Sequence, residues 1–189
     1  NGKIARIRKN LSGNNAKVID ASGMYVTPGI IDAHSHAMMD AVNEFSYAVA
    51  SMARIRDVLD PTDITIYRAL GGGVTAANLL HGSANPIGGQ NQVIKLRWGS
   101  LPEQLKFAEA PGGIKFALGE NVTRSNRPDS TRYPGSRMGV EQIIRDAFYA
   151  AQDYQERWDR WRTSHEGPPP RHDLELEALA EVVAGTRWI

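Results

Sequence analysis

The sequence predicts an α/β fold with a mainly parallel sheet. Short, mostly apolar segments at residues 30–34, 74–80 and 112–121 alternate with patterns that are typical of helices. Strands of a parallel sheet show such continuous apolar runs because helices cover both of their faces. A complete (β/α)8 barrel typically needs about 250 residues. The chain has 189 residues, so we expect either an open sheet or an incomplete barrel.

The first predicted elements are strands. Ile4 and Ile7 alternate with charged side chains and a Gly-Asn turn follows, so residues 3–19 are expected to form strand and turn. Further on, Pro28-Gly29 interrupts a run of apolar and β-branched residues. This pattern predicts a short strand, a kink, and then a buried strand over residues 30–34.

The middle of the chain predicts one helix and two strands. Asp60 or Thr62 is expected to cap a helix that ends at a run of three glycines, and a buried strand follows over residues 74–80. The alternating segment 91–99 predicts another strand. The glycine-rich run 82–89 lacks the Lys-Ser/Thr ending of a phosphate loop, so we expect an irregular loop at the active site there.

The last third of the chain predicts two helices. Apolar residues recur at three- and four-residue steps from Gly139 to about Thr163, which indicates a long amphipathic helix. A proline-rich linker at residues 168–170 ends it. Asp173 is expected to cap a last helix that reaches Ala184, and the terminal residues TRWI predict the opening of another strand.

Composition restricts the functional classes. The chain carries 22 basic and 21 acidic side chains, and this near-neutral balance indicates neither a nucleic-acid partner nor an anionic membrane surface. No apolar run approaches the ~20 residues of a membrane span. Without any cysteine, a metal ion must be bound by histidine, carboxylate or a modified lysine. No signal peptide is visible, but the chain begins at Asn1 without Met, so the localisation stays open between the cytoplasm and export.

Two histidines follow the predicted strand at residues 30–34 with one residue between them. Side chains of a strand alternate with a period of two, so His34 and His36 lie on one face. At the carboxyl end of a barrel strand, such a pair can bind one metal ion. The spacing by itself is a weak signal, because His-x-His also occurs by chance.

The sequence around these histidines carries a more specific pattern. Residues 20–36 follow D-A-x-G-x-x-V-x-P-G-x-I-D-x-H-x-H. This stretch closely resembles the amidohydrolase superfamily, within its group of dihydroorotase-, hydantoinase- and imidazolonepropionase-like enzymes. A weaker resemblance to the imidazolonepropionase-like members continues through residues 71–97, 112–124 and 131–148, so that it covers most of the chain.

The resemblance implies a fold and a metal site. Residues 28–189 would form the first half of a (β/α)8 TIM barrel, and residues 1–27 would form part of a small β-sandwich that precedes it. The chain would then be the N-terminal portion of a longer enzyme. His34 and His36 would bind a divalent metal ion, with zinc expected and one or two ions in the complete site. Asp32, two residues earlier, is expected to support the fold or the ligands rather than to bind the metal.

Three further residues are candidates for the site. The setting of Lys115 resembles the hydantoinase-type strand whose carboxylated lysine bridges two metal ions; the alternative is a lysine whose amine reaches water along a buried stem. Glu120 is a rival bridging carboxylate in the loop after Gly119. His81 either contacts the substrate and shapes the site, or is hydrogen-bonded inside a tight turn.

These expectations predict a metal-dependent hydrolase of C–N bonds in amides or cyclic amides, in which a metal-activated hydroxide attacks a small-molecule substrate. The catalytic base is expected beyond Ile189, because no remaining Asp or His fits the role that the family gives it. The chain alone is therefore expected to be inactive, and to aggregate unless the missing C-terminal half of the barrel covers its open sheet edges.

Two other functions stay open. The polypeptide could be a non-catalytic fragment or a degenerate homologue that acts with a partner chain. It could also belong to a ring deaminase of the same superfamily. Deaminases commonly use one metal ion and no bridging lysine, so a carboxylated Lys115 would count against that reading.

Overall fold

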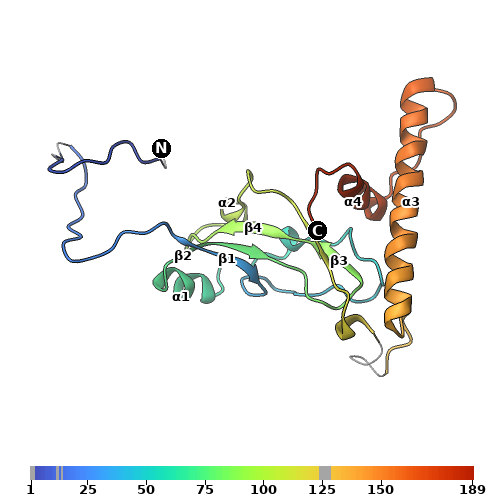
Figure 1. Cartoon of the computed structure of the whole chain (residues 1–189), viewed down its shortest axis with the longest axis horizontal. Coiled ribbons are helices and arrows are strands. Elements are labelled where there is room, and N and C mark those ends of the chain that lie inside the picture. Colours follow the sequence, from blue (N-terminus) through green and yellow to red (C-terminus); the bar gives the residue numbers. More distant parts are fainter. Residues whose placement is uncertain (1–2, 12, 14, 124–128) are drawn as a thin grey trace.

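A computed structural model describes residues 3–11, 13, 15–123 and 129–189, and it has a mixed α/β architecture (Figure 1). The strands are β1 (Ile30–Ser35), β2 (Val74–Leu79), β3 (Ile87–Gln90), β4 (Gln92–Lys95) and β5 (Ile114–Phe116). The helices are α1 (Thr65–Gly71), α2 (Pro102–Leu105), α3 (Arg137–Ser164) and α4 (Leu174–Val183), with short 3₁₀ turns at Ile55–Asp57 and Glu120–Val122.

The strands form two small sheets. One has the order β1-β2-β4 and the other pairs β3 with β5. β1 and β2 are parallel, as predicted, but β4 runs antiparallel to β2, and β5 runs antiparallel to β3. The prediction of a mainly parallel sheet is therefore correct for the first pair only. The chain passes from β2 to β4 through β3 without a helix, and a parallel connection normally needs a crossover of a dozen or more residues.

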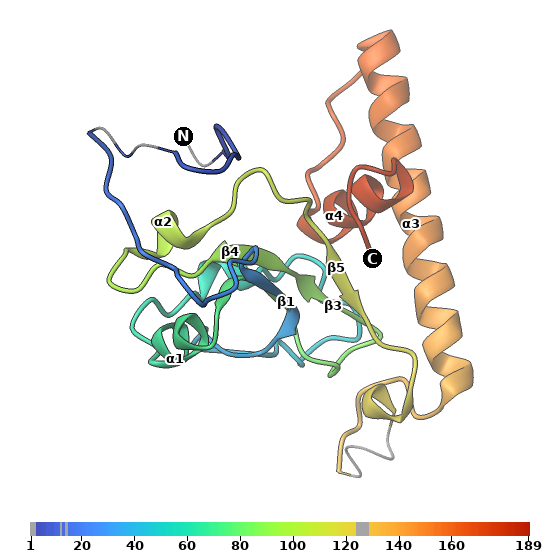
Figure 2. The same ribbon diagram turned by 60° about the vertical axis from the view of Figure 1, so that its left-hand side comes forward.

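The N-terminal segment forms no strand in its described residues 3–11, 13 and 15–27. It extends away from the sheets in Figures 1 and 2, and Ile4 and Tyr25 are 80% and 98% exposed. The strand predicted within residues 3–19 is thus wrong for this structure. A strand requires a neighbour that pairs its backbone groups, and no described segment pairs with this one. The assignment of residues 1–27 to a β-sandwich stays a prediction.

The core lies in two main clusters. The larger one lies between the β1-β2-β4 sheet and α1, and its buried members are Met38, Ile55, Leu59, Ile66, Ala77, Leu79, Ile94, Leu96 and Leu105. The second joins the β3-β5 sheet to α3 and α4, which pack side by side (Figure 2). The prediction of a buried strand over residues 30–34 is wrong, because every residue of β1 is exposed or only half-buried, with Ile30 and Ile31 57% and 69% exposed.

The C-terminal helices follow the sequence pattern closely. α3 extends from Arg137 to Ser164, against a predicted range of 139–163. Asp173 caps α4 as predicted, because its Oδ1 accepts hydrogen bonds from the backbone N–H groups of Glu175 and Leu176. The predicted terminal strand is present as a short parallel bridge between Trp188 and Gly113, at the edge of β5.

Two local predictions are corrected by tertiary contacts. α1 begins at Thr65, and its first turn is bound by Asp63 rather than by Asp60 or Thr62: Oδ1 of Asp63 accepts from the Thr65 N–H at 2.8 Å. The glycine-rich run 82–89 is not wholly irregular, because β3 begins at Ile87. It forms a strand since its backbone pairs with β5.

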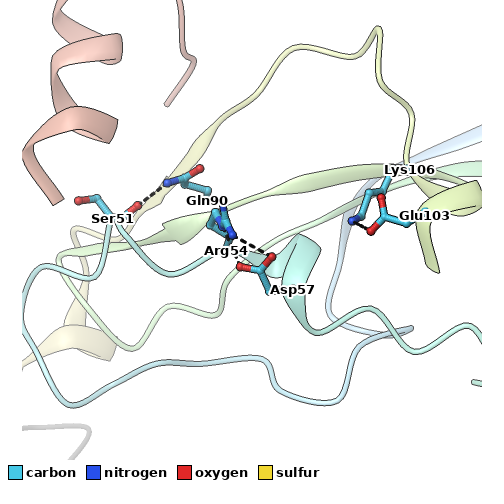
Figure 3. A network of polar contacts seen from close by, with 6 residues as sticks. All are labelled: Ser51, Arg54, Asp57, Gln90, Glu103 and Lys106. Atoms are coloured by element: carbon cyan, nitrogen blue, oxygen red, sulfur yellow. Dashed lines mark hydrogen bonds and ion pairs between the residues drawn. The ribbon is translucent and has the colours of Figure 1, made fainter. Parts of the chain in front are cut away.

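The segment that precedes α1 is fastened to β3. Nε2 of Gln90 donates to the Ser51 carbonyl oxygen at 2.8 Å (Figure 3). The Gln90 N–H donates to the Ala53 carbonyl oxygen at 2.8 Å. Arg54 forms an ion pair with Asp57, with 2.7 Å between Nε and Oδ2, and Figure 3 draws both side chains.

Within the described residues, no helix combines the length and the apolar character that crossing a membrane requires.

Candidate metal centre

The side chains of His34 and His36 converge at the carboxyl end of β1. Their Nε2 atoms lie 3.0 Å apart, and the rings meet edge to face with centroids 4.8 Å apart. The alternation of side chains along a strand explains why both rings lie on one side. Two nitrogens at this separation can both lie at the ~2.0–2.1 Å bond length from a single zinc ion.

The tautomer of His36 suits metal binding. Its Nδ1 lies 2.9 Å from the carbonyl oxygen of Leu80. A carbonyl oxygen only accepts hydrogen bonds, so Nδ1 carries the proton, and Nε2 of the neutral ring keeps its lone pair. Histidine ligands of metal ions typically donate their second ring nitrogen in this way, which fixes the ring orientation. In the metal-free chain, the Nε2–H of His34 can donate to that lone pair.

The surroundings of His34 favour its neutral form. Desolvation by neighbouring atoms lowers the pKa of His34, and the nearby charges of Lys115 and His36 lower it further, while Asp32 acts in the opposite direction. Asp32 itself accepts a hydrogen bond from the backbone N–H of His34 at 3.1 Å. This contact joins Asp32 to the backbone of the strand that carries His34, and the supporting role of Asp32 stays a prediction.

The two candidates for the bridging role, Lys115 and Glu120, lie in different surroundings. Lys115 is half-buried in β5 and lines a cavity of about 550 Å³ together with Ile31 and Ala33 of β1. Its charge lowers the pKa of His34. Glu120 begins a 3₁₀ turn and its side chain is exposed. Neither bridging role is tested by these contacts, and both stay predictions.

His81 is hydrogen-bonded inside a turn, as in the alternative to a substrate contact that the sequence left open. It is 2% exposed, its Nδ1 donates to the carbonyl oxygen of Gly82 at 2.8 Å, and its Nε2 accepts from the Glu44 N–H at 2.7 Å. Burial lowers the pKa of His81, and the hydrogen bond that Nε2 accepts requires the neutral ring. The backbone N–H of Glu44 occupies the only lone pair of the ring, on Nε2, so His81 presents no nitrogen to a metal ion in this arrangement.

Sequence reasoning gave no role to Asn85, which is completely buried beside this turn. Its Nδ2 donates to the carbonyl oxygens of Glu44 and Tyr47, each at 2.7 Å. The signal was present in the sequence, since an Asn-Pro pair often marks a turn. The partners of the side chain lie about 40 residues earlier in the chain and could not be read from it.

Two histidine nitrogens alone do not complete a metal site. Among residues 3–11, 13, 15–123 and 129–189, no group of three or more His, Cys, Asp or Glu side chains is placed to bind a metal ion. Zinc sites in proteins use at least three protein ligands. The histidine pair therefore fits part of a divalent metal centre, and the described residues do not supply the rest.

No model of a known protein family matches the chain. The chain is 34% identical over 195 residues to the amidohydrolase tasK of Hapsidospora irregularis, an alignment that covers 90% of this chain and 20% of that protein. It is 54% identical over 35 residues to a dihydroorotase of Bacillus cytotoxicus, covering 18% of this chain and 8% of the relative. It is 35% identical over 75 residues to an adenine deaminase of Clostridium botulinum, covering 38% of this chain and 12% of that protein.

A solved structure matches almost the whole chain. The crystal structure of an amidohydrolase from Thermotoga maritima MSB8 superposes with a TM-score of 0.88 and 32% identity, over 97% of this chain and 49% of that one. Together with the relatives, this match shows that the chain belongs to the amidohydrolase superfamily. It spans about half the length of the Thermotoga chain and a fifth of the length of tasK.

Proposed function

We propose that the chain is the histidine-bearing part of a metal-dependent hydrolase that cleaves C–N bonds in amides or cyclic amides. The observation that carries the proposal is the convergence of two Nε2 atoms to 3.0 Å, with the ring of His36 oriented by the Leu80 carbonyl oxygen. The relatives named amidohydrolase and dihydroorotase support a hydrolase of this class.

The fold proposed for the complete enzyme is a (β/α)8 barrel, with residues 28–189 as its first half and residues 1–27 as part of a β-sandwich. The TM-score of 0.88 over 97% of this chain and 49% of the Thermotoga amidohydrolase supports it. The second half would cover the exposed apolar side chains of Ile30 and Ile31. The small-molecule amide substrate would then bind between the two halves.

Each candidate residue of this chain has a separate role in the proposed mechanism. His34 and His36 would hold a divalent ion, expected to be zinc, which supplies a water of lowered pKa and polarises the substrate carbonyl. Asp32 would brace the backbone of His34. Lys115, as a carbamate, would join a second ion to the first. We assign the base that moves the proton to the leaving nitrogen to the part of the full-length parent outside this chain.

A deaminase is the second candidate, because the chain is 35% identical over 75 residues to an adenine deaminase. The chemistry differs in the leaving group, which would be ammonia from a ring carbon. The state of Lys115 separates the two candidates. Mass spectrometry of a native peptide that retains the carbamate would favour the amide hydrolase, and an unmodified Lys115 with a single bound ion would favour the deaminase.

A third candidate is a non-catalytic piece that acts with a partner chain. The intact mass of the native polypeptide distinguishes it from an enzyme fragment. A mass near 20.8 kDa would rule out a self-contained hydrolase, because the chain of that mass supplies two ligand histidines. A mass of roughly twice that value is expected, and the isolated chain is expected to aggregate through its unpaired strand edges and exposed apolar side chains.

The experiment that tests the proposal uses the full-length parent. N-acyl amino acids, dipeptides, cyclic ureides and adenine are incubated with the protein before and after removal of metal ions by a chelator. We expect hydrolysis of one of the amide classes, loss of that activity with the chelator and recovery on addition of zinc. Turnover that is unaffected by the chelator and by His34→Ala would contradict the proposal, and ammonia released from adenine alone would favour the deaminase.

A further inference from the structure

His81 is 2% exposed, and the proposed chemistry gives its side chain no part. Its two ring nitrogens have different partners. Nδ1 donates to the Gly82 carbonyl oxygen at 2.8 Å and Nε2 accepts from the Glu44 N–H at 2.7 Å. The ring therefore joins the turn after β2 to the segment that follows the histidine pair.

The chain leaves room for this ring with two glycines of β3. A Cβ atom at Gly88 would lie 2.8 Å from Nδ1 of His81, and a Cβ atom at Gly89 would lie 2.9 Å from its Cδ2. Neither position can carry a side chain without displacing the imidazole. Because Gly88 and Gly89 have no side chains, β3 leaves the space that the imidazole ring of His81 occupies.

The turn that carries His81 is bound to the strand end that carries His36. The Leu80 N–H donates to the Ser35 carbonyl oxygen at 3.0 Å, and the Leu80 carbonyl oxygen accepts from Nδ1 of His36 at 2.9 Å. The Gly82 N–H donates to the Val42 carbonyl oxygen at 2.9 Å. With the His81–Glu44 bond, residues 80–82 and 35–44 are joined by four hydrogen bonds.

Two further side chains fix the far end of the same segment. Asn85 donates to the carbonyl oxygens of Glu44 and Tyr47 at 2.7 Å. Arg132 donates to the carbonyl oxygens of Phe45, Tyr47 and Ala84. The loop after the histidine pair is thus held from several directions, and His81 is the contact nearest to Leu80 along the chain.

We propose that His81 is a positioning residue for His36: it locks residues 80–82 against residues 42–44, and the Leu80 carbonyl oxygen held in this way selects the Nδ1–H tautomer and the ring orientation of His36. The inference rests on the proposed function only in taking His36 as a metal ligand. The hydrogen-bond network around His36 exists with or without a metal ion.

The test uses the full-length parent labelled with ¹⁵N-histidine, as wild type and as His81→Leu, His81→Gln and His81→Asn. Leu removes both hydrogen bonds. Gln places an acceptor where Nε2 meets the Glu44 N–H, and Asn instead places a donor near the Gly82 carbonyl oxygen. Asp173→Ala is the control, because it removes the cap of α4 and leaves both hydrogen bonds of His81 in place. The readouts are the ¹⁵N shifts of the His36 ring in the metal-free protein and the affinity for zinc alone.

We expect the Nδ1–H tautomer of His36 in the wild type, a mixture of tautomers in His81→Leu, and zinc binding that is about 10–100-fold weaker, as for other lost supporting contacts of metal ligands. His81→Gln should recover most of both signals. Asp173→Ala should lower the melting temperature without changing either.

A folded His81→Leu variant with the wild-type His36 tautomer and zinc affinity would overturn the inference. If His81→Leu fails to fold, the comparison of His81→Gln with His81→Asn decides: equal His36 tautomer populations in the two would overturn it. If the wild type binds no zinc, the proposed function fails, while the tautomer measurement still supports or overturns the role of His81.

Discussion

The Nδ1–H of His36 donates a hydrogen bond to the carbonyl oxygen of Leu80, 44 positions along the chain, across 2.9 Å. This contact fixes which nitrogen of His36 faces His34. Both Nε2 atoms then lie where one ion can meet them. A backbone oxygen just after the neighbouring strand β2 thus sets the orientation of the His36 ring.

Zinc should stabilise the protein only when both histidines are present. At a zinc concentration 100 times Kd, binding to the folded state alone adds about 2.7 kcal/mol to the free energy of unfolding. His34→Ala should remove this gain, while its own effect on the metal-free protein stays within about 0.5 kcal/mol, since the side chain is exposed. Thermal unfolding with and without zinc measures both effects.

The matched control is His165→Asn, which replaces an exposed histidine that has a left-handed backbone conformation, with φ of 55°. Asn tolerates this conformation well. An equal loss of zinc stabilisation in this variant would show that zinc binds to surface histidines in general.

His81 should make stability depend on pH below neutrality. Burial holds its pKa below the ordinary value, whereas in the unfolded chain it titrates near about 6.5. The unfolded state therefore binds more protons between the two pKa values, and stability falls as pH drops below about 6.5. Urea unfolding at several pH values should show this slope in the wild type and a smaller slope in His81→Gln. The same slope in His81→Gln as in the wild type would contradict the assignment of a buried, neutral ring to His81.

Asp63 should contribute stability that acid removes. Its carboxylate accepts from the N–H groups of Thr65 at 2.8 Å and Met38 at 2.7 Å, and the Thr65 bond is the main cause of its lowered pKa. Asp63→Ala is expected to cost about 1–2 kcal/mol at pH 7. Because the folded pKa is the lower one, the difference from wild type should persist above about pH 4 and vanish as the pH falls through the folded pKa.

The control for that variant is Asp60→Ala. The Asp60 carboxylate binds Thr62 within one exposed turn, so its removal should cost less than half as much. Equal losses from the two variants would mean that the bond to Met38 contributes nothing measurable to stability.

Gly88→Ala should destabilise the protein, because its Cβ atom would lie 2.8 Å from Nδ1 of His81 and 3.2 Å from the Lys115 carbonyl oxygen. Overpacking of this kind typically costs about 1–3 kcal/mol. Gly71→Ala is the matched comparison, since nothing lies within 4 Å of its Cβ position at the end of α1. That change should be neutral or stabilise by up to about 1 kcal/mol. Chemical denaturation of both variants measures the difference, and a harmless Gly88→Ala would refute the packing described for His81.

The parts of the fold that follow local rules were predictable from the sequence. α3 has its apolar residues at helical spacing, and Asp173 precedes α4 as a cap whose bonds reach only two and three residues ahead. The shared side of His34 and His36 follows from the period of a strand.

Elements that depend on distant partners were not predictable. Asp63 replaces the expected caps because its second oxygen binds Met38, 25 residues earlier. β3 forms in a glycine-rich run because β5 pairs with it and His81 packs against its glycines. The alternating segment at residues 3–19 forms no strand in its described residues, since alternation cannot supply a partner.

The metal content of the purified full-length parent tests the central claim most directly. Elemental analysis of the wild type and of the double variant His34→Ala/His36→Ala, prepared in parallel, should find one or two divalent ions per wild-type chain, zinc foremost, and less than about a tenth of that in the variant. Wild-type protein without Zn, Fe, Mn or Ni, or a double variant that retains its full metal content, would contradict the account.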